Sequence, residues 1–146
     1  MKTNYSLIFI SIAVFLAACA QKTHQSETHH QPLQINELML TTIASASNTI
    51  WAIQSFDDDI NWVELNKAVT DMHNSSTRLL NGGLKKDGSA INISPEWLSW
   101  SQQMIDATND LQQAINQRQE NDYFDASDRL YTPCEECHKQ YLGSSL

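Results

Sequence analysis

The sequence contains little glycine, little proline and few basic residues. Its 146 residues include four glycines, three prolines and nine Lys or Arg against seventeen Asp or Glu. No glycine-rich phosphate loop, strand-rich run or nucleophile elbow is present. The formal net charge of −8 leaves no basic face to neutralise phosphates, so we expect no nucleic-acid partner.

Cysteine is equally scarce, yet two of the three cysteines stand in one pentapeptide, Cys134-Glu135-Glu136-Cys137-His138. The pattern C-x-x-C-H is typical of the attachment site of a c-type haem. Two thiols at this spacing add across the two vinyl groups of one haem, and the adjacent imidazole becomes the proximal axial ligand. The sequence therefore predicts one covalent haem c on Cys134 and Cys137, with His138 on the iron.

The pentapeptide has three other interpretations. A zinc site on Cys134, Cys137 and His138 would need a fourth ligand from a second cluster. A redox-active cysteine pair of the thioredoxin type would sit in a βαβ context, whereas the surrounding pattern is helical. A structural disulfide between residues so close would close a very small loop and stabilise little.

The third cysteine, Cys19, follows a segment typical of a signal peptide. One positive charge within residues 1–6 precedes an apolar stretch over residues 7–16, and small residues stand before Cys19. The stretch is shorter than the roughly 20 residues that span a membrane, although a plain secretory signal and a retained anchor are the alternatives. Leu16-Ala17-Ala18-Cys19 resembles the lipobox of bacterial lipoproteins, which implies cleavage after residue 18 and acylation of Cys19. Ala20 then implies sorting to the outer membrane, on its periplasmic side.

The mature chain divides into two parts. Residues 19–32 are polar and lack apolar periodicity, which predicts a lipidated flexible tether whose lipid is the only contact with the membrane. Residues 33–146 have the size of one domain. Without Lys2, eight basic residues face seventeen acidic ones, so the mature net charge is −9. This charge is compatible with a basic protein partner, and solvated helix surface is the alternative explanation of the acidity.

Apolar residues recur at three- and four-residue steps, which predicts four amphipathic helices and an all-α domain. The first runs from Pro32 to about Ser55, and the second follows an N-cap at residues 57–59 and ends at residues 81–83. After a loop over 84–93, Ser94-Pro95 starts the third. The fourth runs from about Asp122 to Leu142, and Pro133 should break or kink it at Thr132. Such lengths and links predict an antiparallel four-helix bundle with the haem near the C-terminal helix.

Two of the predicted buried faces carry the candidate ligands. The first helix buries Ile35, Met39, Ile43, Ala46, Ile50 and Ile53. The fourth buries Phe124, Leu130, Tyr131, Cys134, Cys137, His138 and Tyr141, so the haem ligands continue a buried face. Trp97 and Leu98 open the buried face of the third helix.

A four-helix domain with C-x-x-C-H close to its C-terminus resembles the cytochrome c prime family over residues 33–146. The resemblance depends on Cys134, Cys137, His138 and Tyr141, which stands three positions after the histidine. It implies a monohaem protein that transfers single electrons to redox partner proteins in the bacterial periplasm and is not an enzyme. The family often pairs through its first two helices, so a homodimer is among the expected assemblies.

The sequence departs from the family where the haem propionates would bind. The family often has an arginine in its first helix and a basic residue after the tyrosine. This chain has no Arg or Lys in its first helix, and Leu142 follows Tyr141. Lys139, Arg129 and Arg78 remain as alternative propionate partners.

In the resembled family the first helix supplies the residue over the distal face of the haem. Met39 is the predicted sixth ligand, because a thioether on the iron suits electron transfer. Leu40 as an apolar blocker and His73 as a second histidine are the alternatives. A blocked or open sixth site would instead favour a five-coordinate protein that binds nitric oxide or carbon monoxide. A haem-free structural lipoprotein with a disulfide is the third functional interpretation.

Overall fold

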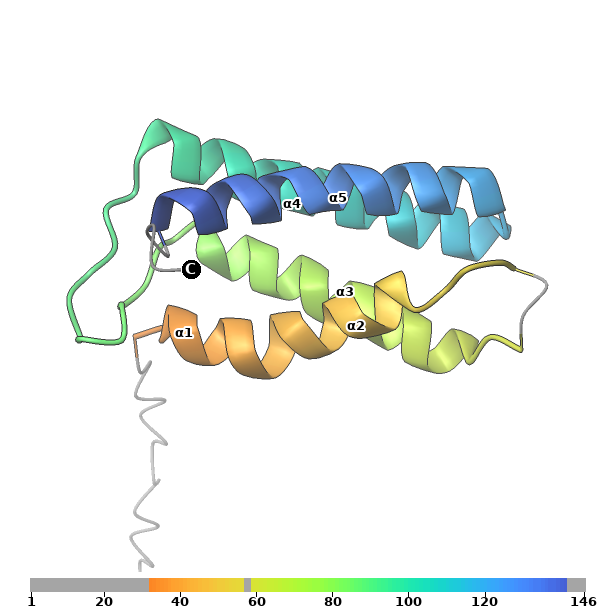
Figure 1. Ribbon diagram of the computed structural model, residues 1–146, viewed down its shortest axis with the longest axis horizontal. Helices are drawn as coiled ribbons and strands as arrows, with labels where there is room; N and C mark the ends of the chain where they lie inside the picture. The colour runs from red at the N-terminus through yellow and green to blue at the C-terminus, as the bar shows by residue number, and fades with distance from the viewer. Residues whose placement is uncertain (1–31, 57–58, 142–146) are drawn as a thin grey trace, which may run out of the picture. The chain divides into compact units, whose positions relative to one another are not determined.

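The computed structural model describes residues 32–56 and 59–141, all within one compact unit, Gln31–Leu146. The predictions for the signal peptide, Cys19 and the tether up to residue 31 concern residues outside these ranges. Within them the elements are α1 (Ile35–Leu38), η1 (Met39–Ile43), α2 (Ala44–Trp51), α3 (Trp62–Leu79), α4 (Pro95–Gln117) and α5 (Glu120–Tyr141) (Figure 1). Two isolated bridges at Leu84 are the sole β-type pairings among the described residues, so the all-α prediction is confirmed. No described helix has the length and apolar character to cross a membrane.

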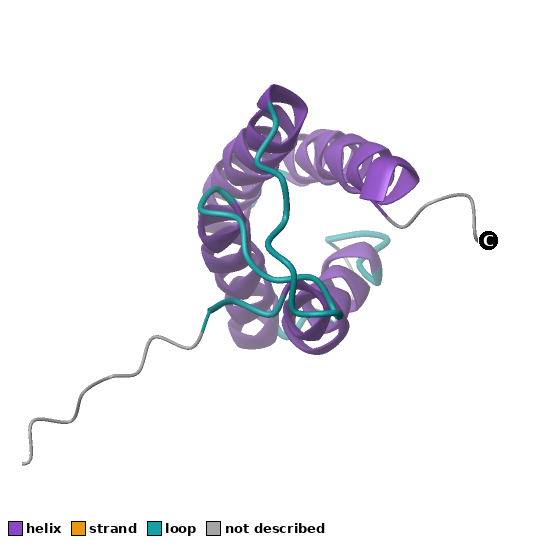
Figure 2. Cartoon of the chain, turned by 90° about the vertical axis from the view of Figure 1, so that its left-hand side faces the viewer, coloured by secondary structure: helices purple, strands orange, loops and turns teal. Residues whose placement is uncertain are grey.

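The helices pack in chain order into a bundle-like arrangement around a shared interior. We call α1, η1 and α2 together the first helical segment; it packs on α3, α3 packs on α4, and α4 packs on α5 (Figure 2). The interior is filled by buried side chains from every helix, among which the largest are Trp97, Tyr123, Ile50, Leu65, Met72, Leu79, Leu111, Ile115 and Leu130. Such burial supplies the main stabilisation of an all-α domain.

The first helical segment and α5 are joined chiefly through side chains at one end. The Tyr123 hydroxyl donates to the Ile50 carbonyl at 2.6 Å, and the Trp51 indole donates to the Ser127 carbonyl at 3.4 Å. The Trp51 ring also meets Tyr131 edge to face, with centroids 6.2 Å apart. These contacts tie α2 to the N-terminal half of α5.

The first helical segment differs from the single α-helix that the sequence predicts. It spans residues 35–51, and η1 is a π-helical turn in which the Ala44 amide donates to the Met39 carbonyl five residues back. The Thr41 hydroxyl bonds the Glu37 carbonyl at 2.7 Å, a back-bond that competes with the regular helical ladder and commonly bends helices. The apolar periodicity of the sequence predicts a helix here, but it does not predict that one turn of that helix is π-helical.

The helix starts follow local capping chemistry. The Asn61 side chain accepts from the Glu64 amide at 3.2 Å, so α3 is capped by Asn61 and the predicted cap at residues 57–59 is wrong. Residues 57 and 58 themselves lie outside the described ranges. The predicted start of α4 is confirmed, because Ser94 caps the Trp97 amide at 3.2 Å and Pro95 is the first helical residue.

Pro133 lies inside α5, so of the predicted break or kink at Thr132 the break is wrong. A proline in a helix interior removes one backbone hydrogen bond and crowds the carbonyl four residues back, at a cost of about 3 kcal/mol. Here Pro133 is buried, and α5 contacts α4 before it, where Arg129 pairs with Asp110, and after it, where Tyr141 packs against Trp97. That packing offsets the local cost, so the helix continues through the C-x-x-C-H motif.

Candidate functional site

The C-x-x-C-H motif lines a small, mostly apolar pocket, which we call the motif pocket. Its cavity has a volume of only about 30 Å³. It is lined by Met39 and Ile43 from η1, Leu79 from α3, Trp97, Trp100, Ser101 and Met104 from α4, and Cys134, Cys137 and His138 from α5. Four segments distant in the sequence therefore meet at this site.

Cys134 and Cys137 form the α5 wall as free thiols. Three-residue spacing in a helix puts both on one side, and both are half-buried against the core. Burial raises the pKa of each thiol to about 11, and the neighbouring Cys137 contributes to the rise at Cys134. Redox-active cysteines have a lowered pKa instead. The local environment therefore disfavours a reactive thiol pair of the thioredoxin type.

His138 lines the rim of the motif pocket and is exposed. The prediction that Tyr131 and His138 lie on the buried face of α5 is therefore wrong, since Tyr131 is 54% exposed as well. Two helical turns separate these residues, so they share one flank of α5 beside the face defined by Leu130 and Cys137. Tyr131 packs against Trp51 of α2, so this flank faces the first helical segment. His138 thus stands further along the flank that faces the helix of Met39.

Met39 is half-buried, packs against the core and lines the motif pocket together with the pentapeptide. The two alternative distal residues lie elsewhere. Leu40 is 70% exposed and does not line the pocket. The ring of His73 faces α4, where its Nδ1 is 3.2 Å from the Thr108 hydroxyl. Met39 alone among the three predicted candidates reaches the motif pocket.

An aromatic wall on α4 completes the site. The Trp97 indole donates to the Leu79 carbonyl at 2.7 Å, which fixes its ring between α3 and α4. Tyr141 meets Trp97 edge to face at 5.1 Å and Trp100 at 6.4 Å. Core packing is thus the observed role of Tyr141. Sequence analysis missed Trp100 and Ser101, although Trp97, Trp100, Ser101 and Met104 have the spacing of one helical face.

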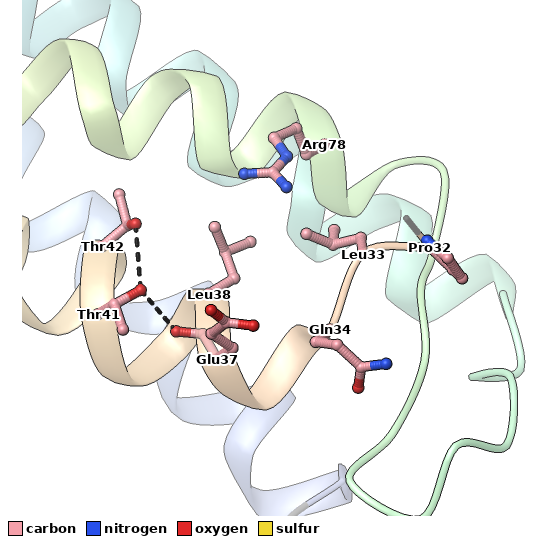
Figure 3. Close-up of a pocket in the computed structure, with 8 residues that line it drawn as sticks. All are labelled: Pro32, Leu33, Gln34, Glu37, Leu38, Thr41, Thr42 and Arg78. Atoms are coloured by element: carbon pink, nitrogen blue, oxygen red, sulfur yellow. Dashed lines mark hydrogen bonds between the residues drawn. The ribbon is translucent and has the colours of Figure 1, made fainter. Parts of the chain in front are cut away.

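The basic residues considered for propionates lie in three different settings. Arg129 pairs with Asp110 at 2.8 Å, and Lys139 pairs with Glu135 and Glu136 at 3.2 and 3.0 Å. Arg78 lines a larger polar groove of about 490 Å³ between α3 and the first helical segment, opposite Glu37, Thr41 and Thr42 (Figure 3). None of the C-x-x-C-H residues lines this groove. Although it is larger than the motif pocket, it is therefore not the candidate functional site.

The residues that line the motif pocket include the donor set that a covalent haem uses: two thiols at C-x-x-C spacing, an imidazole at the rim and a thioether from another helix. The cavity of about 30 Å³ is too small for the porphyrin in this conformation, so a haem would have to part the lining side chains. Among the described residues, no three or more His, Cys, Asp or Glu side chains cluster as metal ligands. No protein-family model, curated protein or solved structure matches this chain.

Proposed function

We propose that this chain is a lipid-anchored monohaem c-type cytochrome that carries single electrons. The observation that supports it best is the motif pocket, in which Cys134, Cys137 and His138 share an apolar space with Met39 of the first helical segment. We further propose that the domain is an antiparallel four-helix bundle of the kind found in the cytochrome c prime family, with its haem beside the C-terminal helix. The packing order of the helices supports this arrangement.

Each residue has a separate task in this proposal. Cys134 and Cys137 would hold the porphyrin through thioether bonds, and His138 would bind the iron. Met39 would be the second protein ligand of the iron, and a thioether ligand would raise its reduction potential. Trp97, Trp100 and Met104 exclude water from the pocket, which also tunes that potential. The bound haem supplies the one-electron iron couple, and no catalytic acid, base or nucleophile is required.

The location and partners are part of the same proposal. The lipobox-like sequence at Cys19 places a lipid on the mature N-terminus, and the polar tether lets the domain face the periplasm from the outer membrane. This domain is acidic, so a redox partner with a basic surface patch would be electrostatically complementary to it. A homodimer through the first two helices remains an expected assembly.

Covalent haem attachment is the direct test. The full chain is produced in a bacterium with a c-type maturation pathway, and haem is detected on the denatured protein after electrophoresis. We expect haem to remain on the wild-type chain and to be absent from the Cys134→Ser, Cys137→Ser double variant. Cys19→Ser serves as the matched control, because it removes a cysteine outside the pentapeptide. A wild-type chain that carries no covalent haem would refute the proposal.

A further inference from the structure

The π-helical turn η1 changes which residues of the first helical segment face the interior. A turn with a hydrogen bond to the fifth residue back holds one residue more than an α-helical turn. Every residue before η1 is therefore rotated by about 100° relative to its place in an uninterrupted helix. This rotation can be compared with the observed burial.

In an uninterrupted α-helix, Met39 would lie about 20° from Ile50 in the middle of the buried face, and Leu38 about 120° from it. The observed burial is the reverse. Leu38 is 4% exposed, Met39 is half-buried at the motif pocket, and Leu40 is 70% exposed. A one-residue offset explains all three, because it moves Leu38 to the centre, Met39 to one flank and Leu40 to the outer side.

The flank to which Met39 moves faces α5. Trp51 follows the buried Ile50 by one residue and marks this flank, since its indole bonds the Ser127 carbonyl of α5. The opposite flank faces α3, where Thr42 lines the groove with Arg78 (Figure 3). The offset therefore turns Met39 away from α3 and toward the helix that carries Cys134, Cys137 and His138.

We propose that η1 is a positioning element that delivers the Met39 thioether to the motif pocket as the sixth ligand and leaves Leu38 to fill the core. This inference depends on the proposed function, because it assumes the bound haem. The chemically relevant feature is the register set by one additional residue between Met39 and Ala44. Met39 is the ligand in this proposal. Residues 40–42 are positioning residues, because they set the rotation of Met39 and do not bind the iron themselves.

Deletion of Leu40 tests the offset. It removes the additional residue, so η1 can become a regular α-helical turn while Met39 and Leu38 keep their places relative to Ile50. We expect the haem-loaded full chain without Leu40 to keep the low-spin spectrum of the wild type and to ignore carbon monoxide. Adding Met39→Ala to this deletion should convert it to a high-spin form that binds the gas.

Deletion of Ser45 is the matched control. This residue is exposed and belongs to α2, but its removal rotates Ile43 by about 100° away from the core. We expect a lower unfolding midpoint for this variant and an unchanged or higher one for the Leu40 deletion. The inference is overturned if the Leu40 deletion retains covalent haem and cooperative unfolding but acquires the spectrum of Met39→Ala. Loss of covalent haem from the wild type would instead refute the proposed function, so the two failures are distinguishable.

Discussion

Burial of Cys134 and Cys137 determines how their free thiols respond to pH. The pKa of each is raised to about 11 in the folded chain, whereas an unfolded cysteine titrates near pH 8.5. A raised pKa in the folded state gives stability that is fully present below the unfolded value and is lost as pH rises toward the folded value. The haem-free protein should therefore lose stability between about pH 8.5 and 11.

Denaturant unfolding at a series of pH values checks this prediction. The Cys134→Ser, Cys137→Ser double variant is the control, because it lacks both thiols and should lose less stability over the same range. Tyr123 is present in both proteins, and burial raises its pKa too, so its contribution cancels in the comparison. An identical alkaline loss in the two proteins would contradict the thiol assignment.

Met39 gives the second prediction at the scale of single residues. Met39→Ala should leave the haem attached but convert a six-coordinate iron to a five-coordinate one, seen as a high-spin spectrum and as carbon monoxide binding. Leu40→Ala changes a neighbouring, largely exposed side chain and should leave the spectrum unchanged. An unchanged spectrum for Met39→Ala would remove Met39 from the ligand set.

Residue-level prediction succeeded for buried faces and failed at their edges. Ile43, Ala46 and Ile50 are buried on the predicted face of the first helical segment, because a regular helix keeps its periodicity from turn to turn. Leu98 and Tyr131 belong to predicted buried faces but are 42% and 54% exposed. Periodicity locates the centre of a face, whereas burial at its edge depends on which neighbouring helix packs there.

The junction between α2 and α5 supplies the prediction at the scale of elements. The Ile50 carbonyl lies in the last turn of α2, where carbonyls lack a helical partner, and it accepts from the buried Tyr123 hydroxyl. Tyr123→Phe should lower the free energy of unfolding by about 1–3 kcal/mol, because it leaves a buried acceptor unpaired. Tyr131→Phe is the control and should have little effect, since its side chain is exposed. Equal losses in the two variants would show that the hydrogen bond does not stabilise the junction.

Helix number and most boundaries followed from the sequence, but three local features did not. Ser94-Pro95 specified the start of α4 because the cap and the first-turn proline are local signals. The cap at Asn61, the passage of α5 through Pro133 and the π-helical turn η1 were missed. Each of these three features depends on tertiary packing or on competition between neighbouring hydrogen bonds. No local sequence pattern predicts them.

At the scale of the whole molecule, charge should control encounters with redox partners. The full chain has a formal net charge of −8, and removal of the proposed signal peptide with Lys2 would make it −9. Electron exchange with a basic c-type cytochrome used as a probe should slow as ionic strength rises from about 0.01 to 0.15 M, because the Debye length falls from about 30 to 8 Å. An acidic probe protein should show the opposite trend. Stopped-flow rates that are independent of salt would contradict electrostatic steering.

The all-α domain contains an apolar pocket that is lined by the C-x-x-C-H residues and by Met39. Sequence predicted the helices and the pentapeptide because both are local patterns. The meeting of α5 with η1 was anticipated only through the family resemblance, since no local pattern fixes which helices become neighbours. The α4 wall that closes the pocket was found from the structure.

The most direct test is an optical spectrum of the full haem-loaded chain, oxidised, then reduced, then exposed to carbon monoxide. The account predicts sharp low-spin bands on reduction and no change with the gas, because His138 and Met39 would both bind the iron. A broad high-spin spectrum that shifts with carbon monoxide would contradict the electron carrier and favour a gas-binding protein. A chain without any haem spectrum would contradict both and favour the haem-free lipoprotein.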